Sequence, residues 1–211
     1  MIRSKRKTAL TTIIGAQRAI CTLLLLTAAE LVTGQQYEPL IITCDSNDHF
    51  SDRCQLNGPF VQATASITQA TLEAEETIED DSQSQRSLWW EWTAPRDGWV
   101  DLKASSETFT PALSAFKGQS LSLLSQLDGV ALEAEATSEE SGLSFQVQSG
   151  ESIQIAVQGP IESSGMVALE IVLRPINDGF QNRTLISLDE NQIYLGSNEF
   201  ATTENGEPDH N

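Results

Sequence analysis

The stretch that most constrains the fold is residues 87–98, SLWWEWTAPRDG, which holds three of the four tryptophans of the chain. Leu88, Trp90 and Trp92 alternate with their neighbours, so an extended chain places two large aromatic rings and a leucine on one face. The proline, aspartate and glycine that follow favour a tight reversal, with a second strand from Trp99. The sequence therefore predicts a tryptophan hairpin at the centre of a β-sandwich core, with Trp90 and Trp92 buried and Trp89 more exposed.

The same alternation of apolar residues recurs along the chain. It predicts strands within residues 60–67, 113–118, 143–147, 153–157 and 167–173, and clear turn signals separate the last three. Short strands at this spacing, without an amphipathic helix, are typical of an all-β fold. We therefore expect an antiparallel, jelly-roll-like β-sandwich over residues 45–174, a length that can bury about two thirds of its unfolded surface.

Four motifs in order resemble a known domain. They are Asn47-Asp48-His49-Phe50, Ala70-Thr71-Leu72-Glu73, the segment WWEWTAPRDG at 89–98, and residues 113–118. This series is similar to a β-sandwich repeat of bacterial secreted and cell-surface proteins, related to the pre-peptidase C-terminal (PPC) domain. The resemblance covers roughly residues 45–174, and the tryptophan strand is its one specific motif.

The opening motifs return near the end of the chain. Residues 177–180, Asn-Asp-Gly-Phe, match residues 47–50, and Ala-Thr-Thr-Glu at 201–204 matches residues 70–73. The two shifts, of 130 and 131 positions, are nearly equal, which marks a tandem repeat. We therefore predict one complete domain followed by a truncated second repeat over 175–211. That repeat lacks a tryptophan strand, so at most a hairpin and a disordered tail after about Asn198 are expected.

The N-terminal residues have the layout of an export signal. Four basic residues precede an apolar run, and the sequence turns polar at Gln35. The run is too short for a spanning helix, so we predict a signal peptide at 1–34, a lead-in at 35–44 and no membrane span after cleavage. A secreted, periplasmic or cell-surface location follows. In such a compartment, Cys44 and Cys54 are predicted to form a disulfide, and a zinc site is disfavoured.

Charge and motifs restrict the partners. The chain has a net charge of −18, and without residues 1–34 the charge is −22, which excludes nucleic acid. No Gly-x-Ser-x-Gly elbow or phosphate-binding glycine loop occurs, and the chain has two histidines. We therefore predict that the protein is not an enzyme.

Calcium is the one cofactor that the family resemblance suggests. Related domains can bind Ca²⁺ through carboxylates near the domain start, and the matching positions here are Asp48, Glu73 and Glu76. This copy departs from the family motif, which is complete at residues 204–208, Glu-Asn-Gly-Glu-Pro. The alternative interpretation of the acidic residues is a well-solvated surface.

Three roles are consistent with these observations. An exposed aromatic platform of Trp89 and Trp99 would bind polysaccharide or cell-surface components, although burial of both rings is the simpler interpretation. Adhesion or a spacer role in a larger secreted protein needs no ligand. The alternative is an accessory domain of a secreted peptidase or glycosidase whose catalytic part lies outside this chain.

Overall fold

The computed structural model describes residues 41–76, 85–132, 139–186, 193, 195–204 and 206–207. The predicted signal peptide and most of the lead-in lie outside the described residues. No helix in the described part is long and apolar enough to cross a membrane.

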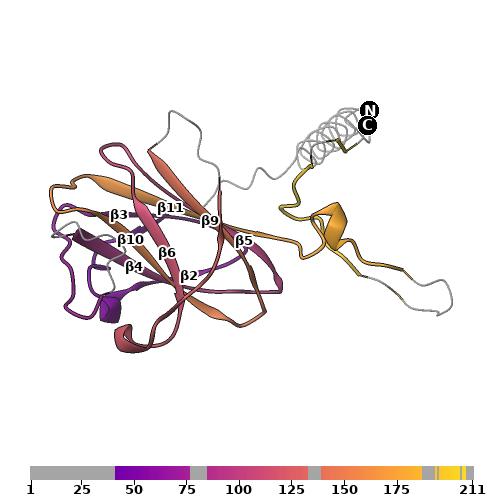
Figure 1. Cartoon of the computed structure of the whole chain (residues 1–211), viewed down its shortest axis with the longest axis horizontal. Coiled ribbons are helices and arrows are strands. Elements are labelled where there is room, and N and C mark those ends of the chain that lie inside the picture. The colour runs from indigo at the N-terminus through magenta and orange to yellow at the C-terminus, as the bar shows by residue number, and fades with distance from the viewer. Residues whose placement is uncertain are drawn as a thin grey trace, which may run out of the picture. The chain divides into compact units, whose positions relative to one another are not determined.

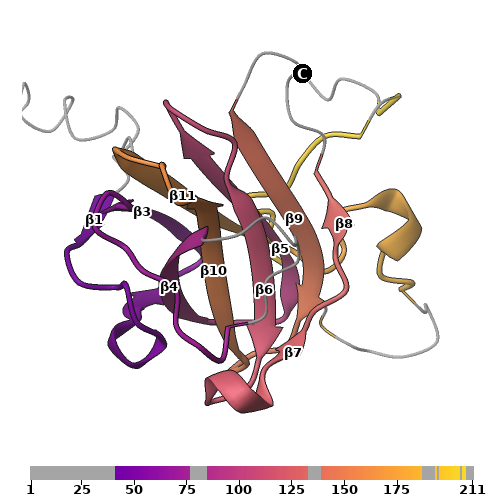
Figure 2. The ribbon, with the colours of Figure 1, turned by 60° about the vertical axis from the view of Figure 1, so that its left-hand side comes forward.

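Two β-sheets face each other and form a sandwich (Figures 1 and 2). The first contains, in spatial order, β1 (Ile41–Cys44), β3 (Phe60–Ser66), β11 (Met166–Arg174), β5 (Gly98–Ser106), β9 (Glu140–Val147) and β8 (Val130–Ala131). The second contains β2 (Cys54–Asn57), β4 (Gln85–Thr93), β10 (Ser152–Pro160), β6 (Ala112–Lys117) and β7 (Ser125–Gln126). The all-β sandwich predicted from the sequence is confirmed.

The chain alternates between the two sheets at most connections. From β3 to β6, and again from β9 to β11, each strand lies in the sheet opposite to its predecessor, as in a jelly roll. The sheets are mixed rather than wholly antiparallel, because β1 pairs parallel with β3 and β2 pairs parallel with β4. The predicted wholly antiparallel sandwich is therefore wrong for the first strand of each sheet. The lead-in does end in an edge strand, β1, as the sequence suggested.

The predicted tryptophan hairpin is wrong, since β4 and β5 lie in different sheets. The intervening turn pairs with the turn at residues 149–151 instead of folding back on its own strand. The Ala94 amide donates to the Glu151 carbonyl (2.9 Å), and the Asp97 carboxylate accepts from the Ser149 amide (2.7 Å). The two strands thus face each other across the core, and their outward-facing side chains point away from each other.

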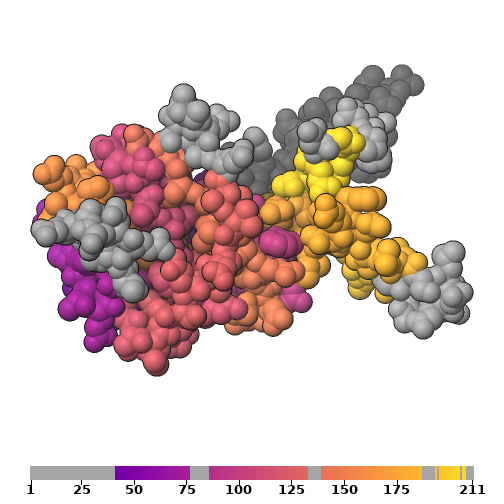
Figure 3. All heavy atoms as spheres, viewed as in Figure 1, coloured from indigo at the N-terminus to yellow at the C-terminus, as the bar shows by residue number. Residues whose placement is uncertain are grey.

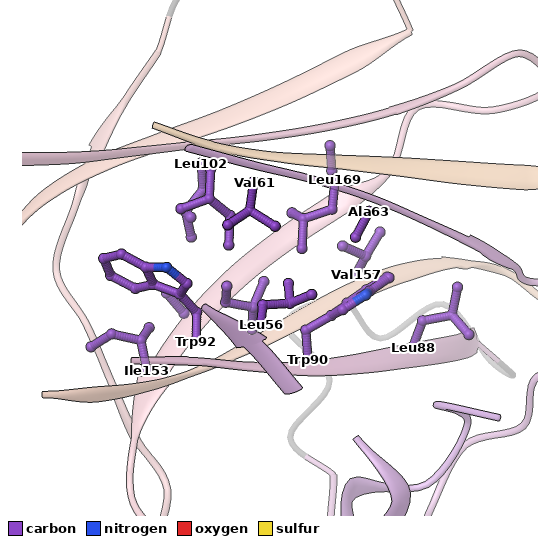
Figure 4. Close-up of a cluster of buried hydrophobic side chains, with 14 of the residues drawn as sticks. Leu56, Val61, Ala63, Leu88, Trp90, Trp92, Leu102, Ile153, Val157 and Leu169 are labelled. Carbon is purple, nitrogen blue, oxygen red and sulfur yellow. The ribbon is translucent and has the colours of Figure 1, made fainter. Parts of the chain in front are cut away.

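The core lies between the sheets and is built by the predicted alternation. Trp90 and Trp92 are fully buried, as predicted, and pair in register with Ile155 and Ile153 of β10 (Figure 4). Leu102 of β5 faces them from the other sheet. Large aromatic and β-branched side chains in facing sheets account for most of the buried apolar surface of such a fold.

The predicted disulfide between Cys44 and Cys54 is present. Cys44 ends β1 in the first sheet, and Cys54 begins β2 in the second. The bond therefore joins the edges of the two sheets and closes the loop that carries the first opening motif. A crosslink over so short a loop contributes on the order of 2–3 kcal/mol to stability.

The chain continues past β11 without a further strand among the described residues. A short 3-10 helix, Phe180–Asn182, repeats the 3-10 helix Phe50–Asp52 near the start. The sequence allows at most a hairpin here, and Leu185, Ile186, Ile193 and Leu195 are exposed and outside strands. The other two candidate strand residues, Leu188 and Tyr194, lie outside the described residues. The described residues of this segment, coloured orange to yellow, are visible on the face shown in Figure 3.

Candidate functional site

A second, smaller apolar cluster lies on the outer face of β4, and Trp89 is at its centre. The indole contacts the Phe50 ring edge to face, with centroids 5.1 Å apart, and lies 5.9 Å from the Phe116 ring. Leu121 and Leu124 pack beside them. Trp89 is only 2% exposed, so the prediction that it is more accessible than Trp90 is wrong. A loop and a short helix cover the outward face that alternation alone leaves open to solvent.

The covering loop is the first opening motif, Asn47-Asp48-His49-Phe50. Asn47 is buried and pairs with Trp89 in both directions: its side-chain amide donates to the Trp89 carbonyl (3.2 Å), and its carbonyl accepts from the Trp89 amide (2.8 Å). These bonds satisfy polar groups that the apolar cluster would otherwise leave without partners. The motif is thus the cover of the tryptophan strand.

The predicted metal residues lie in two segments that hydrogen bonds join: Asp48 in the covering loop, and Glu73 and Glu76 in residues 70–76. Asp48 accepts hydrogen bonds from the amide (2.6 Å) and hydroxyl of Thr71. Glu73 accepts from the Phe50 amide (2.7 Å). Each carboxylate therefore fastens one backbone segment to the next.

Glu76 accepts hydrogen bonds from β4 itself. One oxygen accepts from the Glu73 amide (3.1 Å), the Ser87 hydroxyl (2.8 Å) and the Trp89 indole N–H (3.2 Å). The other oxygen is buried and has no hydrogen-bond partner among the described residues. Burial raises the pKa of Glu76 above its usual value, and the hydrogen bonds to its ionised form offset only part of this effect.

This arrangement does not fit a shared calcium site. A Ca²⁺ ion takes six to eight oxygen ligands, whereas these carboxylates accept from amide and hydroxyl groups. No group of three or more histidine, cysteine or acidic side chains is placed to hold a metal ion within the described part of the chain. The three residues act instead as local acceptors that shape the opening loop.

An ion pair anchors the far side of the loop. The Arg53 guanidinium lies 4.4 Å from the centre of the Phe50 ring and donates to Glu91 of β4 (3.0 Å). Burial raises the pKa of Glu91, but hydrogen bonds from Ser152 and two glutamines and the charge of Arg53 outweigh it and lower the pKa to about 2. Arg53 and Glu91 are not recognisable as a pair in the sequence, since 38 positions separate them.

Trp99, the second predicted platform residue, is half-buried on β5. Its neighbours Val100 and Leu102 point into the core, so Trp99 lies on the outer face of the first sheet. Trp89 lies on the outer face of the second. The structure therefore does not bring the two rings together, because the turn between β4 and β5 passes from one sheet to the other.

Comparison with known proteins gives neighbours in fold only. No family model matches the sequence, and no curated protein does. Among solved structures, the chain is similar to the pre-peptidase C-terminal domain of a collagenase from Bacillus anthracis, with 8% identity, a TM-score of 0.34, and 65% of this chain and 99% of that chain covered.

A second solved structure is CorA, a surface-associated copper-binding protein important for copper acquisition in Methylomicrobium album BG8. It shares 9% identity at a TM-score of 0.35, and the match covers 62% of this chain and 99% of that chain. The PPC domain that the motifs resemble is thus among the neighbours in fold. Likenesses this distant carry no information about a ligand.

Proposed function

We propose that the protein is a non-catalytic extracellular β-sandwich module that works as a spacer and holds the segment after β11 in a fixed orientation. We call the contact of Arg174 with Asp101 and Asp178 the joint. The observation that carries this proposal is the position of Arg174, the last residue of β11. Its guanidinium donates two hydrogen bonds to Asp101 of β5 (2.7 and 3.0 Å) and a third to Asp178 beyond the strand (2.6 Å). Bidentate pairing of this kind fixes direction as well as distance.

The joint is well buried for an ion pair near a surface. The Asp178 side chain is 2% exposed, and Ser144 of β9 also donates to Asp101 (2.6 Å). Burial raises the pKa of Asp178, but hydrogen bonds from Arg174 and Thr202 outweigh it, so the pKa is lowered overall. The Phe200 ring adds a second contact, 5.7 Å from the ring of Phe60 at the start of β3.

Other features support an extracellular spacer. The disulfide suits an oxidising compartment, and the acidic sequence favours a well-solvated surface. Buried aromatic rings at Trp89 give no support to a sugar platform, so adhesion and carbohydrate binding rank second. The same module would serve equally as an accessory domain beside a catalytic one.

Two measurements test this proposal. On a glycan array, the full chain is expected to show no saturable binding, and a saturable signal would favour the carbohydrate role. Asp101→Asn should speed amide exchange in residues 175–183, because Arg174 loses its bidentate partner.

Glu170→Gln is the matched control, since Glu170 lies on the same strand as Arg174 but pairs with Gln62. It should leave exchange in residues 175–183 unchanged. Equal exchange rates in the two variants and the wild type would contradict the proposal of a fixed joint.

A further inference from the structure

The two opening motifs have the same internal contacts. In the first, Thr71 donates its amide to Asp48 (2.6 Å) and Phe50 donates its amide to Glu73 (2.7 Å). In the second, the Thr202 amide donates to Asp178 (2.6 Å), and the Phe180 amide donates to Glu204 (3.0 Å). In both copies the glutamate of the second motif segment also donates its amide to the glutamate three residues later: Glu73 to Glu76, and Glu204 to Glu207 (3.1 Å each).

The arginine of the motif is also repeated. Arg53 and Arg183 each donate to the carbonyl of their phenylalanine (2.8 and 3.0 Å), and each guanidinium lies 4.4 Å from the centre of that ring. The second motif is therefore folded locally to the same design as the first.

The two copies differ in what covers them. Phe50 is 5% exposed and Phe180 is 66% exposed. Further along, at a shift of 130 positions, Leu56, Ala63 and Ala65 are each 1% exposed, whereas their counterparts Ile186, Ile193 and Leu195 are 64%, 88% and 93% exposed. Apolar residues occupy the core positions of the second copy, but among the described residues they are exposed.

The first copy shows what the cover is. Three contacts from β4 close its opening: the Trp89 ring on Phe50, the Trp89 backbone on Asn47, and Glu91 on Arg53. Phe116 of β6 completes the apolar cluster around the two rings. In the second copy Asn177 is exposed, and Arg183 makes no ion pair with any described residue. β4 itself is not available, because it already lies between β2 and β10.

We propose that the described residues of this segment, 177–186, 193, 195–204 and 206–207, are a preformed docking surface for a strand of the same chemistry as β4, belonging to a second sandwich. The strand carries a large aromatic residue to cover Phe180 and a carboxylate two positions later to pair with Arg183. Docking buries Phe180, Ile186, Ile193 and Leu195 and so completes a second core. This proposal does not depend on the spacer function.

A graft supplies such a strand in register. Asn211 corresponds to position 80 at the shift of 131 that relates residues 201–204 to residues 70–73, so residues 81–174 are appended after Asn211. The extended protein should show a second cooperative unfolding transition, and the Phe180 amide should become protected from exchange. Phe180→Ala, or Trp89→Ala in the appended copy alone, should remove both changes and leave the first transition in place.

A control graft decides whether a negative result is informative. In it, residues 177–207 are replaced by their counterparts, residues 47–76, the opening that closes on β4 in the first domain. If the control forms two folding units but the native graft leaves Phe180 unprotected, the proposal is overturned. If neither graft folds, an isotope-labelled full chain is titrated with the peptide of residues 85–93: shifts at Phe180 and Thr202 support the proposal, and their absence overturns it.

A different occupant would show itself without any graft. If the ungrafted chain forms a concentration-dependent dimer in sedimentation velocity that Phe180→Ala abolishes, the surface binds a second copy of the chain, and the proposal is overturned.

Discussion

The two opening motifs of this chain form the same local structure in different surroundings. The first is closed by Trp89 and held to β4, and the second has the same hydrogen bonds but an exposed phenylalanine. Short-range bonds between carboxylates and backbone amides therefore suffice to shape the motif, since they recur without the strand. Burial of the aromatic ring is what ties the first motif into the sandwich.

The largest effect is expected from removing the cover of the first motif. Trp89→Ala should destabilise the sandwich by about 3–5 kcal/mol, because the indole is buried and packs against the rings of Phe50 and Phe116. Chemical denaturation followed by far-UV circular dichroism measures this loss. Trp90→Ala, in the main core, should cost a similar amount, and a Trp89 variant as stable as the wild type would refute the buried position.

The matched phenylalanines come next. Phe50→Ala should cost about 3–5 kcal/mol, whereas Phe180→Ala should change the stability by less than about 0.5 kcal/mol. The same denaturation measurement applied to both variants gives the comparison directly. Equal losses would mean that Phe180 is buried in solution and that the second motif is already covered.

Glu91 should contribute a dependence of stability on pH that the second copy lacks. Its pKa, lowered to about 2, makes the ionised form favour the folded state. That stability is present above the ordinary pKa near 4.5 and is lost as the pH falls from there through about 2. Glu91→Gln should weaken the dependence of the denaturation midpoint on pH over this range. An unchanged dependence on pH would contradict the role of the ion pair.

Glu76 should act in the opposite direction and with a smaller effect. Its raised pKa means that its ionised form disfavours the folded state, so this contribution to stability falls as the pH rises from about 4.5 through the raised value. Glu76→Gln keeps one oxygen for Ser87 and Trp89, so stability at pH 7 should be unchanged or raised. A clear loss at pH 7, measured by thermal melting, would show that the charge is required.

The sequence predicted the sandwich because alternation along each strand reports directly which side chains face a core. It did not predict that β4 and β5 lie in opposite sheets, since a turn motif reports that the chain reverses but not which strand it then pairs with. The exposure of Trp89 was predicted wrongly for a related reason. An outward position is buried when a loop distant in sequence folds over it. The only sequence feature related to that covering loop was the Asn-Asp-x-Phe motif, which forms the loop.

The candidate site was predicted in its residues but not in its chemistry. Asp48, Glu73 and Glu76 do lie together, as the family resemblance implied. Spacing along the sequence could not reveal that their oxygens accept from Thr71, Phe50 and other nearby groups. The pairing of Arg53 with Glu91 was missed, because the two residues are 38 positions apart and only the fold brings them together.

The central claim is that one motif is closed on β4 and the other is open, and amide hydrogen exchange of the full chain tests it most directly. The amides of Thr71 and Phe50 should exchange only with global unfolding, like the amides of β10 and β11. The amides of Thr202 and Phe180 have the same acceptors but no covering strand, so they should exchange through local opening, at least ten times faster on an order-of-magnitude estimate. Protection of Phe180 equal to that of Phe50 would contradict the account.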